Sequence, residues 1–264
     1  MFAEPKDLFY LYINGATNRK LTFREGLRVL SLVAVYFFRD LLKVFSGLLR
    51  RRRGTAIPDF RNRKIVFANT ANNYEALNFL LKRYDDTILL CSGGYVKKLP
   101  GAITVGKYLR TRGLGRYFCL IYLALHKRYR IIHYEKIVKQ YGFVESFVGL
   151  LQANRPACIF NSNDHDPASR ALMLAAKKLG IPCIYLQHAS VSKFFPPMRA
   201  SHSLLYGQYS EDIYRSIPGS EGRFIPVGNH KFDAFRLWIE NKRSTGRIGV
   251  AFNTLDPVPE VLAL

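Results

Sequence analysis

Two polar segments near the centre of the chain hold side chains that can move protons. Residues 161–166 read NSNDHD and directly follow an apolar run at residues 158–160. Residues 187–190 read QHAS and directly follow a second apolar run at residues 183–186. A neutral histidine can act as a general base toward a hydroxyl group, and a carboxylate can do the same or orient a histidine. The candidate catalytic residues are therefore His188, Asp164, Asp166 and His165.

These candidates also have a structural interpretation. Asp166 stands directly before Pro167, where it would cap the beginning of a helix, and His188 could cap the turn that follows its strand. Helix capping explains Asp166 well and His165 poorly. The sequence therefore leaves open which of the four residues takes part in catalysis.

Amide, hydroxyl and basic side chains at the ends of apolar runs are candidates for substrate binding. Such groups hydrogen-bond to sugar hydroxyls, and a lysine can neutralise the charge of a leaving phosphate. The asparagines after residues 64–68 could equally form turns or helix caps, and residues 229–231 could form a simple turn. The candidate binding residues are Asn69, Asn72, Asn163, Gln187, Ser190, Lys193, Asn229, His230 and Lys231.

Motifs of several other enzyme classes are missing from the sequence. It contains no G-x-S-x-G elbow, no G-x-G-x-x-G loop, no H-E-x-x-H pair and no C-x-x-C pair. We therefore expect no dinucleotide cofactor and no metal ion. The cysteines lie far apart, and three of them stand in or beside apolar runs, which favours buried thiols over disulfides or zinc. They are Cys91, Cys119, Cys158 and Cys183.

Alternating strand and helix patterns position the polar segments. Helices are predicted at residues 74–84, 167–179 and 209–217, the last capped by Ser210, and strands at residues 64–68, 87–91, 158–160, 183–186, 203–206 and 223–227. Repeated strand–helix steps predict the α/β class, with a Rossmann-like, mostly parallel sheet and helices on both faces. Because parallel strands end at one edge, both histidine-containing segments should meet where open α/β sheets bind ligands.

The chain divides into three predicted parts. Residues 1–54 form an amphipathic, basic helical extension, residues 55–243 form the Rossmann-like domain with a basic helical insertion near residues 95–156, and residues 244–264 begin a truncated second Rossmann-like domain. The helix expected at residues 23–49 suits an anionic membrane surface, although it could instead pack on the protein's own core. The arginines that would contact the membrane are Arg50, Arg51, Arg52 and Arg53.

The whole chain is strongly basic. Its net charge is +21 and its isoelectric point is near 10.0. This charge predicts a polyanionic partner, which could be a nucleic acid, an anionic membrane surface or an acidic polymer. The N-terminus has no basic segment ahead of an apolar core and is not a secretory signal.

Three stretches give the central region a resemblance to a known group of enzymes. They are LQHASVSKFFPP at residues 186–197, LLYG at residues 204–207 and PVGNHKFD at residues 226–233. In order and spacing they resemble bacterial capsule and teichoic-acid transferases of the GT-B fold, namely polysialyltransferase-like, Kdo-transferase-like and CDP-glycerol glycerophosphotransferase-like enzymes. The family usually has glycine where this chain has Ala189.

The resemblance covers roughly residues 158–235 and implies the N-terminal, acceptor-side half of such an enzyme. Enzymes of this kind transfer a sugar or polyol-phosphate unit from a nucleotide-activated donor, bound mostly by the second domain, to a glycan or lipid-linked acceptor. A peripheral position on the cytoplasmic face of the inner membrane is then expected. Alternatives are a nucleic-acid-binding protein, although no helix-turn-helix, KH or RRM signature is present, and a non-catalytic module that binds acceptor or lipid.

Overall fold

A computed structural model describes the central part of the chain. The described residues are 59–92, 94, 96–105, 131–193, 195–229 and 233, together with single residues between 22 and 38. For residues 131–141 only the backbone is described. All the elements discussed below belong to one compact unit that ends at Asn229.

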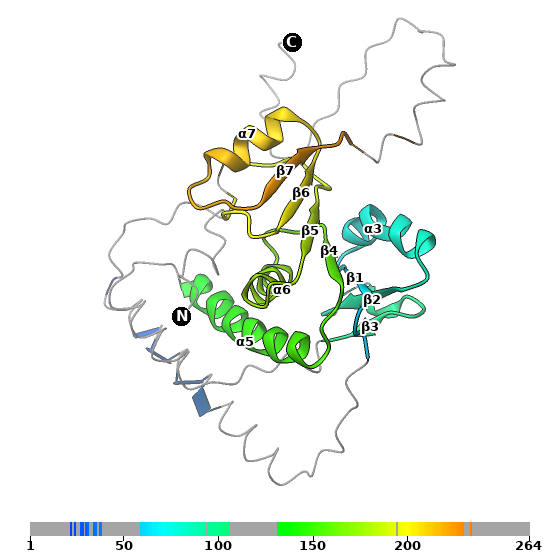
Figure 1. Cartoon of the computed structure of the whole chain (residues 1–264). Coiled ribbons are helices and arrows are strands. Elements are labelled where there is room, and N and C mark those ends of the chain that lie inside the picture. Colours follow the sequence, from blue (N-terminus) through cyan, green and yellow to red (C-terminus); the bar gives the residue numbers. More distant parts are fainter. Residues whose placement is uncertain are drawn as a thin grey trace, which may run out of the picture. The chain divides into compact units, whose positions relative to one another are not determined.

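In the described part of the chain, the core of the fold is a seven-stranded sheet in which every neighbouring pair of strands is parallel (Figure 1). The strand order is β3-β2-β1-β4-β5-β6-β7. The strands are β1 (Lys64–Phe67), β2 (Thr87–Cys91), β3 (Ile103–Thr104), β4 (Cys158–Asn161), β5 (Cys183–Leu186), β6 (His202–Leu205) and β7 (Arg223–Pro226). The predicted Rossmann-like, parallel α/β class is confirmed. Only the short β3 is not among the predicted strands.

Helices cover both faces of the sheet (Figure 1). They are α3 (Ala71–Arg83), α5 (Ile131–Ala153), α6 (Pro167–Lys178) and α7 (Gln208–Ser216), with a short 3₁₀ helix η1 (Val96–Lys98). Ile65 and Phe67 of β1 pack with α5, α6 and α7 on one face, whereas Val66 packs with α3 and η1 on the other. Apolar side chains on both faces are what a parallel sheet between two helical layers requires.

Two helices begin with side-chain caps. The hydroxyl oxygen of Thr70 accepts a hydrogen bond of 3.2 Å from the backbone N–H of Asn73 and caps α3. Asp166 caps α6 by accepting a bond of 3.0 Å from the backbone N–H of Ser169, and Pro167 is the first residue of the helix. The capping role predicted for Asp166 is confirmed.

The beginning of α7 differs from the prediction. The helix starts at Gln208, after Gly207, and has no side-chain cap. Ser210 lies inside the first turn and is buried, so its predicted capping role is wrong. The reason is that the turn from β6 into α7 takes only residues 206 and 207, which lets the helix begin earlier.

The strand order creates a switch point between β1 and β4. From β1 the chain proceeds to β2 and β3, and it then returns to β4 on the other side of β1. The helix after β1 packs on one face of the sheet, and the helix after β4 packs on the other. The loops at the carboxyl ends of β1 and β4 therefore diverge, and open α/β sheets bind ligands at such a point.

Several predictions fall outside the described residues. They concern Arg50, Arg51, Arg52, Arg53, Cys119, His230, Lys231 and residues 244–264. Of the helix predicted at residues 23–49, the described residues between 24 and 38 are helical. No helix among the described residues combines the length and apolar character that crossing a membrane requires.

Candidate active site

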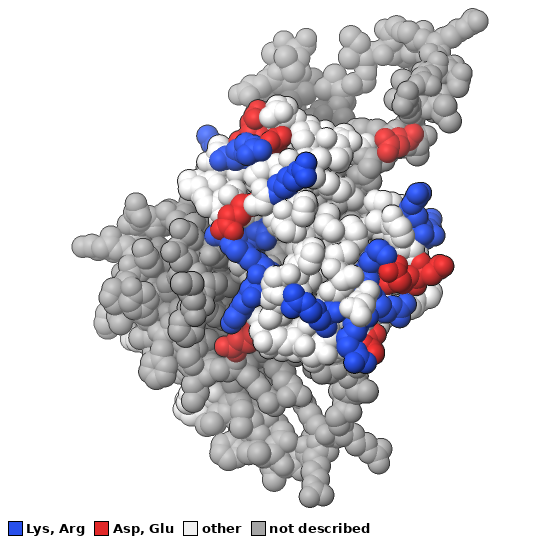
Figure 2. Space-filling view, in the orientation of Figure 1, with Lys and Arg blue, Asp and Glu red and all other residues white. Residues whose placement is uncertain are grey.

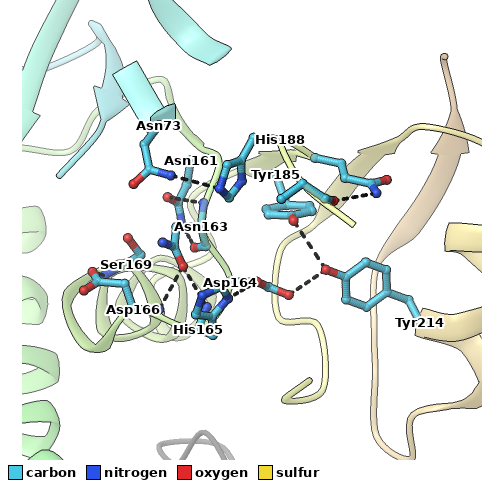
Figure 3. A network of polar contacts seen from close by, with 12 residues as sticks. Asn73, Asn161, Asn163, Asp164, His165, Asp166, Ser169, Tyr185, His188 and Tyr214 are labelled. Atoms are coloured by element: carbon cyan, nitrogen blue, oxygen red, sulfur yellow. Dashed lines mark hydrogen bonds and ion pairs between the residues drawn. The ribbon is translucent and has the colours of Figure 1, made fainter. Parts of the chain in front are cut away.

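The carboxyl ends of β1, β4 and β5 bring the predicted polar segments together. Asn69 follows β1, the loop with Asp164, His165 and Asp166 follows β4, and His188 follows β5. These strands are direct neighbours in the sheet, in the order β1-β4-β5. Figure 3 shows the resulting network of polar contacts, in which the two histidine-containing loops lie at the same edge.

Asn69 joins three loops at the switch point. Its Oδ1 accepts hydrogen bonds from the backbone N–H and the hydroxyl of Ser92, which follows β2, at 2.8 and 2.9 Å. Its Nδ2 donates a bond of 2.9 Å to Oδ2 of Asp166, which follows β4. The side chain thus spans the join between the two halves of the sheet. Its bonds are directed to the protein, and substrate binding by Asn69 stays a prediction.

The loop after β4 is held in shape by its own asparagines. The fully buried Asn161 donates through Nδ2 to the backbone oxygen of Asn163 at 2.7 Å and accepts from its N–H at 3.1 Å. Oδ1 of Asn163 accepts bonds from the backbone N–H groups of His165 and Asp166 at 3.0 and 2.8 Å. These bonds satisfy the backbone of a mostly buried loop and fix the directions of the side chains that follow.

Asp164 is the buried carboxyl group of the site, with 1% of its surface exposed. Its Oδ1 lies 2.9 Å from Nδ1 of His165, and its Oδ2 accepts a hydrogen bond of 2.6 Å from the hydroxyl of Tyr214 on α7 (Figure 3). The side chain of His165 is 33% exposed, and its ring centroid lies 5.3 Å from that of Phe195. A carboxyl group held in this way fixes the orientation and tautomer of a histidine ring.

Two buried tyrosines lie behind Asp164. Burial raises the pKa of Tyr214 well above its ordinary value, and the negative charge of Asp164 raises it further. Burial and then the same charge raise the pKa of Tyr185, whose hydroxyl lies 3.4 Å from that of Tyr214. Both phenols are therefore protonated at neutral pH, and Tyr214 remains a hydrogen-bond donor to Asp164.

His188 faces the beginning of α3. Its Nε2 lies 3.4 Å from Nδ2 of Asn73, and its Nδ1 is buried (Figure 3). Asn73 is 2% exposed, and its backbone oxygen accepts a bond of 3.3 Å from the hydroxyl of Ser162 in the loop after β4. The first turn of α3 therefore contacts both histidine-containing loops. Catalysis by His188 stays a prediction.

Gln187 fixes the course of the chain beside His188. Its Nε2 donates a bond of 2.9 Å to the backbone oxygen of Ala189, and its Oε1 accepts a bond of 2.7 Å from the backbone N–H of Tyr206 after β6. Both ends of this buried amide are thus engaged by the backbone, so the structure gives it a positioning role. Ser190 and Lys193 follow on the same loop and are exposed.

Two other predicted binding residues lie apart from this cluster. Asn72 is exposed in the first turn of α3, whereas its neighbour Asn73 points toward His188. Asn229 follows β7, the last strand in the order of the described sheet, three positions from β4. The structure therefore groups the histidines with Asn69 and places Asn229 elsewhere on the sheet.

Tyr214 and Asn73, whose side chains lie within hydrogen-bond distance of candidate catalytic residues, are not among the predicted site residues. Tyr214 stands 50 positions after Asp164, on α7, and nothing in its local sequence distinguishes it from a core tyrosine. Asn73 had a detectable signal, because it precedes the buried Ala76 and Leu77 at helical spacing and so shares their face of α3.

A cavity of about 440 Å³ lies at the opposite edge of the sheet, at the amino ends of β5 and β6. Of its charged side chains, Glu221 forms ion pairs with both Lys177 and Arg199. No predicted site residue in the described ranges lines it. We therefore place the candidate chemistry at the carboxyl edge of the sheet, where the predicted residues gather. Within the described residues, no group of three or more metal-ligating side chains is found.

The sequence was compared with protein-family models and with curated proteins, and neither comparison gives a match. What the chain does is therefore inferred from the position, burial and contacts of its own side chains.

Proposed function

We propose that the chain is the acceptor-side part of a GT-B-type glycosyltransferase-like enzyme of bacterial surface-polysaccharide assembly. It transfers a sugar or polyol-phosphate unit from a nucleotide-activated donor to a glycan or lipid-linked acceptor. The observation that carries this proposal is the pair of a buried Asp164 and a partly exposed His165 at the switch point of a parallel sheet, with His188 on the adjoining loop. Open α/β sheets bind ligands at this point, and these residue types suit proton abstraction from a hydroxyl group.

The chemistry of the proposed reaction matches these groups. Transfer to a hydroxyl acceptor breaks its O–H bond and forms a bond from that oxygen to the anomeric carbon or the phosphorus of the donor. The nucleotide phosphate leaves with the bonding electron pair. A side chain of the cluster takes the proton, and we propose that Lys193, exposed on the loop after β5, neutralises the leaving phosphate.

The hydrogen bonds of Gln187 give a physical reason for a Gln-His pair at the end of β5, which is part of the resemblance. A glutamine at the end of β5 ties its own loop to the loop after β6, through Ala189 and Tyr206. The histidine that follows is thereby held at a fixed place on the ligand-binding edge of the sheet. Ala189 in place of glycine does not prevent the hydrogen bond from Gln187, because the backbone oxygen of residue 189 accepts it.

The proposed location is the cytoplasmic face of the inner membrane, with peripheral binding to anionic lipid. Its support is a helical segment near the N-terminus in which large apolar side chains are exposed beside arginines. Apolar side chains flanked by cations suit the boundary between headgroups and acyl chains. The exposed residues are Arg24, Leu27, Arg28, Leu30, Val35 and Phe38.

A nucleic-acid interface has less support. On the face shown in Figure 2, Lys and Arg side chains occur in several places with Asp and Glu side chains among them. Nucleic-acid-binding proteins gather basic side chains on one face or along one helix. Weak, salt-sensitive DNA binding would follow from the net charge of +21 alone and would not identify a function.

A transfer assay tests the proposal. The full gene product is incubated with membranes and a panel of nucleotide-activated sugars and polyol phosphates, and products are identified by mass spectrometry. We expect transfer from at least one donor, and we expect it to be lost in the double variant His165→Gln/His188→Gln. Asp86→Asn is the matched control, because Asp86 pairs with Lys64 at the amino edge of the sheet, away from the cluster.

Two outcomes contradict the proposed function. One is the absence of transfer from every donor, and the other is undiminished transfer by the double variant. If the protein binds acceptor glycan or anionic vesicles but transfers nothing, the alternative of a non-catalytic binding module is favoured. Loss of transfer in Asp86→Asn as well would show that the loss reflects folding and not the site.

A further inference from the structure

We propose that His165 is the general base of this site and that Tyr214 is a positioning residue that acts on it through Asp164. The assignment rests on the proposed transfer function, for which it names the proton acceptor. The loop after β4 supplies Asp164 and His165, and α7 supplies Tyr214 from 50 positions further along the chain.

Asp164 determines which ring nitrogen of His165 carries the proton before the reaction. A carboxylate oxygen accepts hydrogen bonds, so the 2.9 Å contact between its Oδ1 and Nδ1 places the proton on Nδ1. In the neutral ring the lone pair then belongs to Nε2, which is the atom that takes the proton from the acceptor hydroxyl. The side chain of His165 is 33% exposed, which gives substrate access to the ring.

Tyr214 holds the other side of the carboxyl group. Its hydroxyl donates a bond of 2.6 Å to Oδ2 of Asp164. Its ring stacks on Phe224 at 6.0 Å between centroids and meets Tyr185 edge-on at 6.1 Å. The hydroxyl is therefore aimed at Asp164 by contacts in the core. The carboxyl group cannot turn toward a different orientation without losing a bond at both oxygens.

The titratable groups around His165 come from its own loop, from β5, from α7 and from the loop after β5. Among the residues that the structure describes, they are Asp164, Asp166, Tyr185, Tyr214 and the exposed Lys193, which precedes the contacting Phe195 on its loop. Asp166 is committed elsewhere, because it caps α6 and accepts a bond from Asn69. Asp164 is therefore the carboxyl group that acts on the ring.

His188 is less suited to take the proton. If the amide nitrogen of Asn73 faces Nε2, as in the 3.4 Å contact, the lone pair of Nε2 accepts its hydrogen. If the amide were turned, its oxygen would face an Nε2 that already carries a proton. In neither arrangement is Nε2 ready to accept a proton from substrate, and Nδ1 is buried.

The proton transfer is balanced without any further reactant. The proton of the acceptor hydroxyl moves to Nε2 of His165 while the acceptor oxygen bonds to the anomeric carbon or phosphorus of the donor. The bond to the nucleotide phosphate breaks with its electrons on that phosphate. The imidazolium that forms faces the Asp164 carboxylate, and it returns its proton to water after the product leaves.

The first test measures the tautomer of His165 without any need for activity. Ring-nitrogen ¹⁵N NMR of the full-length protein is recorded, and the His165 signals are assigned by their loss in His165→Gln. We expect the Nδ1–H tautomer in the neutral ring. Tyr214→Phe removes one hydroxyl and keeps the stacked ring, and it should shift the population toward the Nε2–H tautomer. Tyr185→Phe removes the neighbouring buried hydroxyl and should leave the tautomer unchanged.

The second test measures the pH dependence of transfer. A general base contributes about 10²–10⁴-fold, so His165→Gln should lower kcat within that range and abolish the loss of activity on the acidic side of the profile. The His188→Gln variant should still lose activity as the pH falls, even where its KM rises. Tyr214→Phe should lower kcat about tenfold with little change in KM, which corresponds to one lost hydrogen bond to a charged group.

Opposite results overturn the assignment. If the loss of activity at low pH disappears in His188→Gln and persists in His165→Gln, His188 is the base. A Tyr214→Phe variant that matches Tyr185→Phe in tautomer and in kcat would end the positioning role of Tyr214. A wild-type protein that transfers nothing contradicts the proposed function and the base role with it, while the ring-nitrogen signals still decide whether Tyr214 positions His165 through Asp164.

Discussion

Replacement of Asn69 by alanine is expected to lower the free energy of unfolding by about 2–3 kcal/mol. Asn69 accepts bonds from the backbone N–H and hydroxyl of Ser92 and donates one to Asp166, at 2.8, 2.9 and 2.9 Å. It therefore joins the chain segments that leave β1, β2 and β4. Alanine removes all of these bonds and supplies no replacement.

The magnitude follows from the kind and burial of the bonds. A neutral intramolecular hydrogen bond contributes about 1 kcal/mol net and one to a carboxylate about 1.5 kcal/mol, so the three bonds together would contribute about 3.5 kcal/mol if they were fully buried. Because Asn69 is only partly buried, water replaces some of the lost bonding and the expected value is smaller. A loss of this size is measurable in a domain whose stability is typically about 5–15 kcal/mol.

Urea unfolding followed by circular dichroism measures the change. Asn72→Ala is the matched control, because Asn72 is the same residue type, lies just beyond the same loop and is exposed. Its effect should stay within about 0.5 kcal/mol. Equal losses in the two variants, or a loss below about 1 kcal/mol in Asn69→Ala, would refute the reasoning that Asn69 holds the three loops together.

Two further predictions concern the backbone and a surface carboxyl group. Gly222→Ala should cost more than about 2 kcal/mol, because φ is +91° and a Cβ would lie 2.2 Å from the backbone oxygen of Ala200. Gly149→Ala in α5, where a Cβ meets nothing within 4 Å, should instead stabilise the protein by about 0.5–1 kcal/mol. Urea unfolding of both variants measures their free energies of unfolding, and equal values would contradict the prediction. Hydrogen bonds from Arg61 lower the pKa of the exposed Asp59 carboxyl to about 2. Since this folded-state pKa lies below the unfolded one, the small stabilisation from Asp59 is present above about pH 4 and lost as the pH falls toward 2. An NMR titration of the Asp59 carboxyl group with a midpoint near pH 4 would contradict this prediction.

Local patterns were sufficient to predict most of the sheet. The apolar runs between polar loops located β2 and β5 at their observed ends, and the Asp166-Pro167 step located the beginning of α6. The two residues of β3 were missed because so short a segment has no periodicity of its own. Ser210 was a misleading cap signal, because Gly207 ends the turn and α7 begins directly after it.

Contacts between distant segments could be predicted only in part. Parallel strands share one direction, so the sequence indicated that the two histidine-containing loops would meet at one edge. It did not indicate which atoms would face each other. The partner of Asp164 depends on how α7 is rotated in the core, and the contact of His188 with Asn73 depends on how α3 packs on the sheet. These are properties of tertiary packing.

The pairing of β1 with β4 also determines when during synthesis the loops that follow these two strands can meet. Lys64 pairs with Cys158, so the centre of the sheet closes only after β2, β3 and α5 have been made. Until then β1 has an open edge whose unpaired backbone groups can bond to another chain. Non-local parallel pairing is slow, because the entropy of loop closure must be overcome before the contacts compensate for it. The bond between Asn69 and Asp166 spans the same join. In a nascent chain the bond between Asn69 and Asp166 therefore forms at the same step that covers this edge of β1.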